Sequence, residues 1–262
     1  MKRGQKARRG FTILEMLVAM GIFLIICAVM FDLLNLSQKK YSGETQLSAA
    51  YQDARLAMDQ IVRDFNVSGY PPADMFSVLP ASSNYATSPV AWSPNYQPPV
   101  PCLIGTAGGG TCATPGDYDL IVETTVNGTV SWIRYQLQGT TLYRAVVQKT
   151  TGDPAGPTSA AGVMVPFLAN VMNNAPSAQL AQITANYPSM FPGGQPQPIF
   201  QYTCDTPTQT MPCPLAGAYN SPKNIRDIAV TLIVMTPQPD LQTQSLKLVE
   251  LNGMGHRVNP VN

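Results

Sequence analysis

One acidic residue stands inside a long apolar stretch near the N-terminus. Glu15 is the only charged residue between Phe11 and Phe31. A carboxylate inside a bilayer costs on the order of 2.5 to 3.5 kcal/mol at the centre of a spanning helix, and less near its end. An acid in such a place is therefore a candidate for a functional ion pair, and it needs a cation.

A cation becomes available if the chain is cut after Gly10. The new α-amino group on Phe11 would lie about one helical turn from Glu15, and the same amine on a neighbouring copy could reach that carboxylate. Such an ion pair would set the register between packed subunits, because charges attract strongly where the dielectric constant is low. Gly10 and Phe11 are thus the candidate processing residues, and Glu15 is the candidate assembly residue.

Groups suited to catalysis or metal binding are scarce. The only histidine, His256, is expected to be an exposed tail residue rather than a general base. The glycine run at 108–110 lacks the lysine of a phosphate loop. Asp117 and Asp119 could bind calcium through a loop, although solvated acids are the better interpretation with so few oxygens. We expect no catalytic residue, no metal and no cofactor.

Four of the five cysteines form two close pairs along the chain, Cys102 with Cys112 and Cys204 with Cys213. In an oxidising compartment, a local disulfide would close each short loop and stabilise it by about 2 to 3 kcal/mol. A zinc site of four thiolates is the alternative, but both spacings are wider than the usual two to four intervening residues. Disulfides are favoured, and four cysteines allow three connectivities.

The stretch that contains Glu15 has the length of a membrane span. Residues 11–31 are enough for a helix to cross the hydrocarbon core, which takes about 20 residues. Five basic residues precede the run and two lysines follow it, and this bias predicts that residues 1–10 stay in the cytoplasm. A cleaved secretory signal is disfavoured, because the run is long and no small-x-small cleavage site follows it. A plain signal anchor would have no use for Glu15.

Residues 10–15 read GFTILE, behind a basic leader and before a long apolar run. This pattern resembles the N-terminal signature of type IV prepilins and pseudopilins, and the resemblance covers the first 30 or so residues. It implies cleavage after Gly10 by a membrane prepilin peptidase, N-methylation of Phe11 and a role for Glu15 in filament assembly. It also implies the inner membrane as the first location, and other major and minor pilins or pseudopilins as partners.

A second helical pattern continues the apolar run. Apolar side chains recur at spacings of 4, 3, 4, 3 and 4 residues, which is typical of one face of an amphipathic helix. They are Leu47, Tyr51, Ala54, Met58, Ile61 and Phe65. No proline occurs before Pro71, so residues 11–66 are predicted to form one nearly continuous helix of about 80 Å. We expect this stripe to hold the head, and the opposite face, Asp64 included, to meet solvent or other subunits.

The remaining chain is predicted to be a long loop followed by strands. Residues 67–116 are rich in Pro, Ser, Asn and Gly. Runs of β-branched and aromatic residues then predict strands, with an edge strand or a short helix at 163–172. The predicted strands are 118–126, 129–138, 141–147, 197–204, 227–235 and 245–251. Asn127 and Gly128 favour a two-residue hairpin turn, because both residues accept positive φ.

These elements predict an α+β fold, with a long N-terminal helix packed on an antiparallel β-sheet head that has long Pro- and Gly-rich loops. The pilin resemblance implies the same architecture. The expected division is a removed cytoplasmic leader at 1–10, a transmembrane or filament-core helix at 11–35, an amphipathic helix at 36–66 and a β-rich periplasmic or extracellular head at 67–262.

Three functional hypotheses follow. After loss of the leader the chain carries 11 basic and 15 acidic residues, which argues against a general nucleic-acid partner. Diffuse similarity of the strand region to large minor pilins of the PilW type, and to the J-type minor pseudopilin of type II secretion, favours a non-enzymatic minor pilin that joins, primes or caps a type IV pilus. A minor pseudopilin is the second hypothesis. The third is a tip adhesin in which Trp92 and Tyr96 of the long loop contact a surface or glycan.

Overall fold

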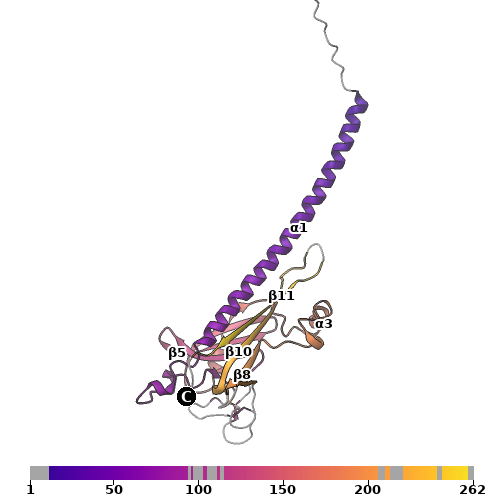
Figure 1. Ribbon diagram of the computed structural model, residues 1–262. Helices are drawn as coiled ribbons and strands as arrows, with labels where there is room; N and C mark the ends of the chain where they lie inside the picture. Colours follow the sequence, from indigo (N-terminus) through magenta and orange to yellow (C-terminus); the bar gives the residue numbers. More distant parts are fainter. Residues whose placement is uncertain are drawn as a thin grey trace, which may run out of the picture.

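The computed structural model describes residues 12–93, 96, 103–104, 111–112, 115–205, 210–212, 221–240 and 244–258. One long helix, α1, extends from a head that is built mainly of β-strands (Figure 1). The head and the helix together form the predicted α+β fold, which is therefore confirmed.

Helix α1 spans Ile13–Asn66, 54 residues, so it is about 80 Å long. It begins after Thr12, whose extended backbone and side-chain oxygen cap the first turn. No proline interrupts it, and it ends at Asn66, three residues before Gly69, whose positive φ of 81° turns the chain away. The helix bends gently along its length (Figure 1).

The first sheet has five strands in the order β1-β4-β5-β6-β7. Their bounds are β1 Val90–Ala91, β4 Asp119–Val126, β5 Thr129–Gln138, β6 Thr141–Gln148 and β7 Val165–Leu168. All neighbours are antiparallel. The β4-β5 turn is the predicted one, with φ of 50° at Asn127 and 82° at Gly128. Pro166 lies in β7, on the edge of the sheet, where a missing N–H does not break the ladder.

The second sheet has four strands in the order β11-β10-β8-β9, also antiparallel. Their bounds are β8 Phe200–Asp205, β9 Thr210–Pro212, β10 Ile225–Met235 and β11 Leu248–His256. A bridge between Val171 and Val234 joins the end of the first sheet to β10. Two short strands, β2 Leu103–Ile104 and β3 Thr111–Cys112, pair in parallel.

Two helices of the head lie outside the sheets, α2 Ala155–Thr158 and α3 Ser177–Asn186. Neither was predicted. Helix α3 buries Ile183 but presents few other apolar side chains to the core, so its sequence lacks a strong 3.6-residue pattern. It follows Pro176, a residue that suits the start of a helix.

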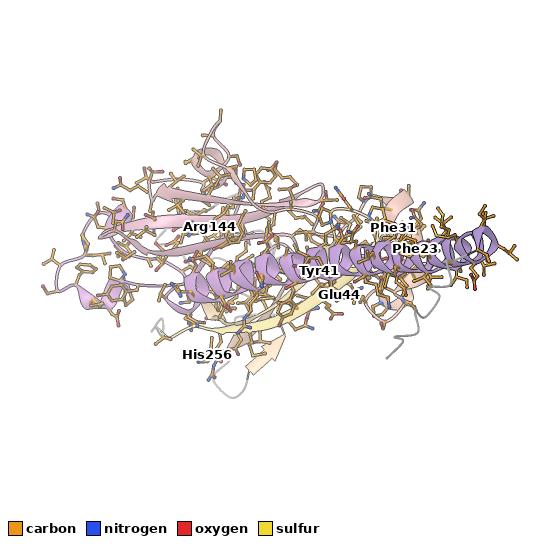
Figure 2. The ribbon with its side chains drawn as sticks, turned by 90° about the horizontal axis from the view of Figure 1, so that it is seen from above. Phe23, Phe31, Tyr41, Glu44, Arg144 and His256 are labelled. Atoms are coloured by element: carbon orange, nitrogen blue, oxygen red, sulfur yellow. The ribbon has the colours of Figure 1, made fainter. Side chains whose placement is uncertain are left out.

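The C-terminal half of α1 lies in the angle between the two sheets (Figure 2). Ala54, Ile61 and Phe65 are fully buried there, among strand side chains of both sheets. Ala50 and Ala57 are also buried, so the stripe is centred on alanines that let the helix approach closely. Tyr51 was expected in this stripe, and that prediction is wrong. Its side chain is 45% exposed, because the contact face is turned away from it.

Two glycines of β11 allow the helix to cross this strand. A Cβ atom on Gly253 would lie 2.6 Å from the sulfur of Met58, and one on Gly255 would lie 2.9 Å from Cδ1 of Phe65. Both distances are shorter than any stable carbon contact. The two missing side chains thus set how closely α1 packs on the second sheet.

Candidate functional site

The N-terminal half of α1 carries apolar side chains on all sides and touches nothing else in the described chain. Every Leu, Ile, Val, Met and Phe between Ile13 and Leu36 is at least 40% exposed. By length and composition, α1 is the one helix among the described residues that could cross a membrane. A helix that is apolar all round needs an apolar environment, either lipid or the helices of other subunits.

Glu15 lies at the N-terminal end of this surface, in a capping box with Thr12. The Thr12 backbone N–H donates to Oε2 of Glu15 at 2.9 Å, and the Glu15 backbone N–H donates to Oγ1 of Thr12 at 3.3 Å. The hydroxyl of Thr12 also donates to Oε2, at 3.1 Å. These contacts hold the carboxylate beside the start of the helix, where the helix dipole favours a negative charge. No cation in the described part of the chain pairs with it.

Gly10 and Phe11, the predicted processing residues, lie outside the described residues. The described chain starts at Thr12, immediately after them. The predicted cleavage and the predicted contact of a Phe11 amine with Glu15 therefore remain predictions.

A polar network locks the last turn of α1 to the first sheet. The hydroxyl of Tyr135 donates to Oδ2 of Asp64 at 2.6 Å, and Nη2 of Arg144 lies 2.9 Å from the same oxygen. Nε2 of Gln60 donates to Oδ1 of Asp64 at 2.7 Å. The expectation that Asp64 faces solvent or other subunits is wrong, because the last turn of α1 is buried in the head, where Tyr135 and Arg144 add two donors to the one from Gln60 of the same helix. Burial, with help from the nearby Asp64 charge, raises the pKa of Tyr135 above its usual range.

The predicted surface contacts Trp92 and Tyr96 are both buried, at 5% and 2% exposure. Their rings pack on each other at 4.7 Å between centroids, and Tyr96 meets Trp132 edge to face at 5.8 Å. The hydroxyl of Tyr96 donates to Glu123 inside the head. The prediction that these two aromatics contact a surface or glycan is therefore wrong. They attach their loop to the first sheet, where both rings are buried away from water and each packs against another aromatic ring.

A fully buried ion pair lies under the same loop. Nζ of Lys149 is 2.8 Å from Oε2 of Glu123, and neither side chain is exposed. The ammonium also donates to the carbonyl of Tyr85 at 2.9 Å and to Oγ1 of Thr87 at 2.8 Å, so all three of its hydrogens have partners. Burial lowers the pKa of Lys149, and Glu123 opposes that shift. Burial also raises the pKa of Tyr96, and the charge on Glu123 adds to this.

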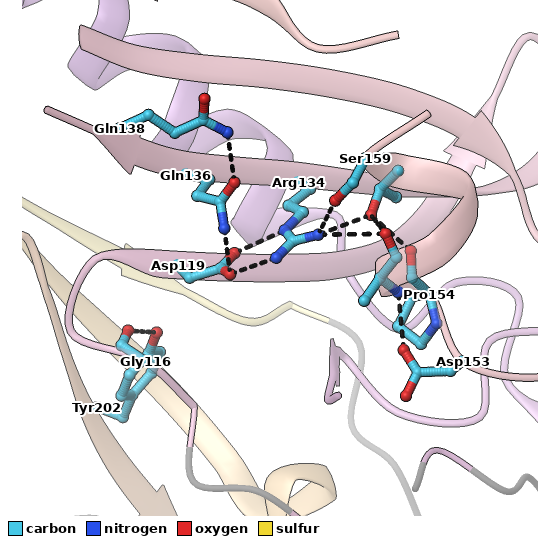
Figure 3. Close-up of polar contacts among 11 residues, drawn as sticks. Gly116, Asp119, Arg134, Gln136, Gln138, Asp153, Pro154, Ser159 and Tyr202 are labelled. Carbon is cyan, nitrogen blue, oxygen red and sulfur yellow. Dashed lines mark hydrogen bonds and ion pairs between the residues drawn. The ribbon is translucent and has the colours of Figure 1, made fainter. Parts of the chain in front are cut away.

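Asp119 and His256, which the sequence offered as candidate ligand and candidate base, take structural positions. Asp119 forms a two-point ion pair with Arg134, at 2.8 and 2.5 Å, and Nε2 of Gln136 donates to it at 3.0 Å (Figure 3). His256 is exposed, as expected, but it is the last residue of β11 and contacts Asp227 on the neighbouring strand, so its expected place in a tail is wrong. The residues that the structure describes contain no cluster of three potential metal ligands.

The predicted cysteine pairs fall largely outside the described residues. Cys102 and Cys213 are not described, and only the backbone of Cys112 is, in β3. Cys204 in β8 is buried and disulfide-bonded. Both predicted pairings therefore remain predictions.

One comparison with known proteins identifies the N-terminus. Residues 5–31 match the family described as the prokaryotic N-terminal methylation motif, which is the signature of type IV prepilins and pseudopilins. The match covers the GFTILE segment with Glu15 and most of the apolar helix. No curated protein and no solved structure matches the chain.

Proposed function

We propose that this chain, a protein of the type IV pilin or pseudopilin kind, is a minor type IV pilin that joins, primes or caps a pilus. In this proposal it is a structural subunit without enzymatic activity. Prepilin peptidase cuts it after Gly10, and Phe11 is N-methylated. Before assembly the mature chain is anchored in the inner membrane, with its N-terminus towards the cytoplasm and its head in the periplasm.

One observation carries this proposal. The apolar half of α1 is exposed on all sides, and its only acid before Asp32 is Glu15, held at the very start of the helix. A lipid bilayer satisfies the apolar side chains but leaves the carboxylate without a cation. A bundle of equivalent helices would satisfy both, because a neighbour's terminal amine would supply the positive charge.

The size of the head supports a minor rather than a major subunit. Among the residues that the structure describes, the head holds a five-stranded sheet, a four-stranded sheet, the β2-β3 pair and helices α2 and α3, and so large a unit is hard to repeat densely along a shaft. The adhesin hypothesis loses its support, because Trp92 and Tyr96 serve the core of the head.

Mass spectrometry of the mature N-terminus, in wild-type and peptidase-deficient cells, tests the processing step. We expect a start at methylated Phe11 in the wild type and an intact leader in the mutant. A chain that keeps its leader in working cells would overturn the proposal.

Glu15→Ala tests assembly. We expect cleavage to stay largely intact and incorporation into filaments to fall, because the carboxylate acts after processing. Normal incorporation of this variant would contradict the proposed contact between Glu15 and a neighbour's amine.

The methylation motif is common to pilins and pseudopilins, so co-purification distinguishes the two. Recovery of the chain with pilus subunits supports the proposal, and recovery with secretion subunits would make it a minor pseudopilin instead.

A further inference from the structure

The buried pair of Lys149 and Glu123 connects two strands that are not neighbours. Glu123 lies in β4, Lys149 directly follows β6, and β5 runs between these two strands. Nζ of Lys149 is 2.8 Å from Oε2 of Glu123, and neither side chain is exposed. The amine and the carboxyl group are therefore held in contact where solvent does not reach them.

This contact is costly as a pair of ions. Removing an ammonium and a carboxylate from water is unfavourable, and their attraction often does no more than offset that cost. Moving one proton from Nζ to Oε2 turns the ions into an amine and a carboxylic acid, which a dry interior tolerates better. Burial acts in the same direction on the lysine, because it lowers the pKa of Lys149. An uncharged amine beside a carboxylic acid is the starting point for amide formation.

The carbon of the carboxyl group is within reach of the amine. A carboxyl C–O bond is about 1.2 Å long, so Cδ of Glu123 lies no more than about 4 Å from Nζ of Lys149. Two groups that a fold holds in a productive geometry react as if each were present at about 10⁵ to 10⁸ M. The sheet therefore supplies the positioning that the same two groups lack in an unfolded chain.

Two donors bind the second carboxyl oxygen. The hydroxyl of Tyr96 donates to Oε1 of Glu123, and Nε1 of Trp132 donates to the same oxygen at 3.3 Å. When an amine attacks Cδ, negative charge develops on this oxygen, and donors that are already in place stabilise it. The ring of Tyr96 also lies over Nζ of Lys149, with 5.6 Å between Nζ and the ring centroid.

Thr87 contacts both of the groups that would react. Its backbone N–H donates to Oε2 of Glu123 at 2.8 Å, and its hydroxyl oxygen accepts from Nζ of Lys149, also at 2.8 Å. The carbonyl of Tyr85 accepts another hydrogen of Nζ at 2.9 Å. A hydroxyl in this place can accept a proton from the attacking amine and donate its own proton to the departing oxygen.

We propose that Lys149 and Glu123 become joined by an amide bond after the head has folded. Nζ forms the new bond to Cδ, and the bond from Cδ to Oε2 breaks. Oε2 leaves as water with two protons from Nζ, one of which passes through the hydroxyl of Thr87. The step needs no oxidant and no other reactant, and the net charge of the pair stays zero. A newly folded chain contains the ion pair, which is consumed as the bond forms.

The bond would cross-link β4 to the end of β6 across β5. The two residues are 26 positions apart, so the link closes a loop and restricts the unfolded chain. It also stays intact when the hydrogen bonds of the sheet break under heat or tension. The chemistry depends only on the folded head, so it holds for a pilus subunit and for a secretion subunit alike.

Mass spectrometry of the wild-type chain tests the proposal. The full-length protein is purified from membranes, unfolded, reduced and digested with a protease, and the peptides that contain residues 123 and 149 are identified. We expect one joined species, lighter than the sum of the two peptides by one water. Two separate peptides of full mass would overturn the proposal. This result requires no variant, so a failure of a variant to fold does not affect it.

A second lysine of the same chain provides the control. Nζ of Lys247 is also 2.8 Å from a carboxylate oxygen, Oδ2 of Asp240, but its side chain is 28% exposed. We expect this pair to remain unlinked in the same digest, because water reaches the amine. A link at this pair too would contradict the importance of the closed site. Lys149→Arg keeps the positive charge and removes the reacting amine, and we expect the joined species to disappear.

The rate of bond formation tests the part assigned to Thr87. The full chain is refolded in detergent, and the joined species is measured over time. We expect Thr87→Val to slow its appearance by at least about tenfold, and Thr87→Ser, which keeps the hydroxyl, to stay within about twofold of wild type. Equal rates in all three chains would overturn the proton transfer through Thr87.

Discussion

The lock between α1 and the first sheet gives the sharpest test of how the head is held. Asp64→Asn keeps the size of the side chain and removes its charge. Three donors converge on this carboxylate, from Gln60, Tyr135 and Arg144, at 2.7, 2.6 and 2.9 Å. An amide has one acceptor oxygen, so at least one donor must lose its partner or face the new N–H group.

The expected cost follows from burial. Removing one partner of a fully buried ion pair costs about 3 to 5 kcal/mol. Here the side chain of Arg144 is 25% exposed and can recover some hydration, while Asp64 and Tyr135 are buried. We therefore expect Asp64→Asn to lower the free energy of unfolding by about 2 to 3 kcal/mol. Asp53→Asn, on an exposed part of the same helix, should change it by less than about 0.5 kcal/mol.

Urea unfolding of the full chain in detergent measures this difference. Both tryptophans, Trp92 and Trp132, are buried in the head, so their fluorescence reports its unfolding. Asp64→Asn combined with Arg144→Met should cost less than the sum of the two single changes, because the double variant leaves no unpaired charge. A cost for Asp64→Asn no larger than that of Asp53→Asn would show that the network does not stabilise the junction.

Three further results are expected. Gly255→Ala should lower the free energy of unfolding by about 1 to 3 kcal/mol in the same assay, because the new methyl group would meet the ring of Phe65. Gly156→Ala is the control, since it has open space around it and should leave the free energy of unfolding unchanged. Equal effects of the two substitutions would refute the packing argument. Lys149→Met should cost about 3 to 5 kcal/mol by leaving a buried carboxylate unpaired, and a thermal midpoint equal to wild type would contradict this. Above about pH 10 the free energy of unfolding should fall, since buried tyrosines with raised pKa keep protons that the unfolded chain releases, and each contributes up to about 1.4 kcal/mol per pH unit. The lowered pKa of Lys149 has the opposite sign and acts only below its usual value of 10.5, where the unfolded chain still holds a proton that the folded chain releases. Tyr135→Phe should flatten this fall, and an unchanged slope would show that Tyr135 does not contribute.

The elements with local signals could be predicted from the sequence. The absence of proline before Pro71 indicated the length of α1, and Asn127 with Gly128 indicated the β4-β5 hairpin. The helix and the hairpin both form through interactions between residues that are close in the chain. Such interactions leave a periodic pattern or a turn sequence that can be recognised without the structure. The β-strand β11 was predicted too short, because Gly253 and Gly255 read as loop residues. They are strand residues that lack side chains where α1 crosses, and that reason is visible only in three dimensions.

At the N-terminal segment the sequence alone identified the prepilin and pseudopilin signature, and the methylation motif matches there. A basic leader, a small residue before Phe11 and one acid in an apolar run lie within a few residues of each other, so a local pattern can report them. The cleavage after Gly10 and the role of Glu15 stay predictions. The interior of the head was decided by the tertiary structure. Glu123 meets Lys149 and Tyr96 across 26 and 27 residues of chain, and Asp64 meets Arg144 across 80. No local pattern encodes such contacts, because they depend on which strands become neighbours. For this reason Trp92 and Tyr96, which the sequence predicted to be surface contacts, are part of the core.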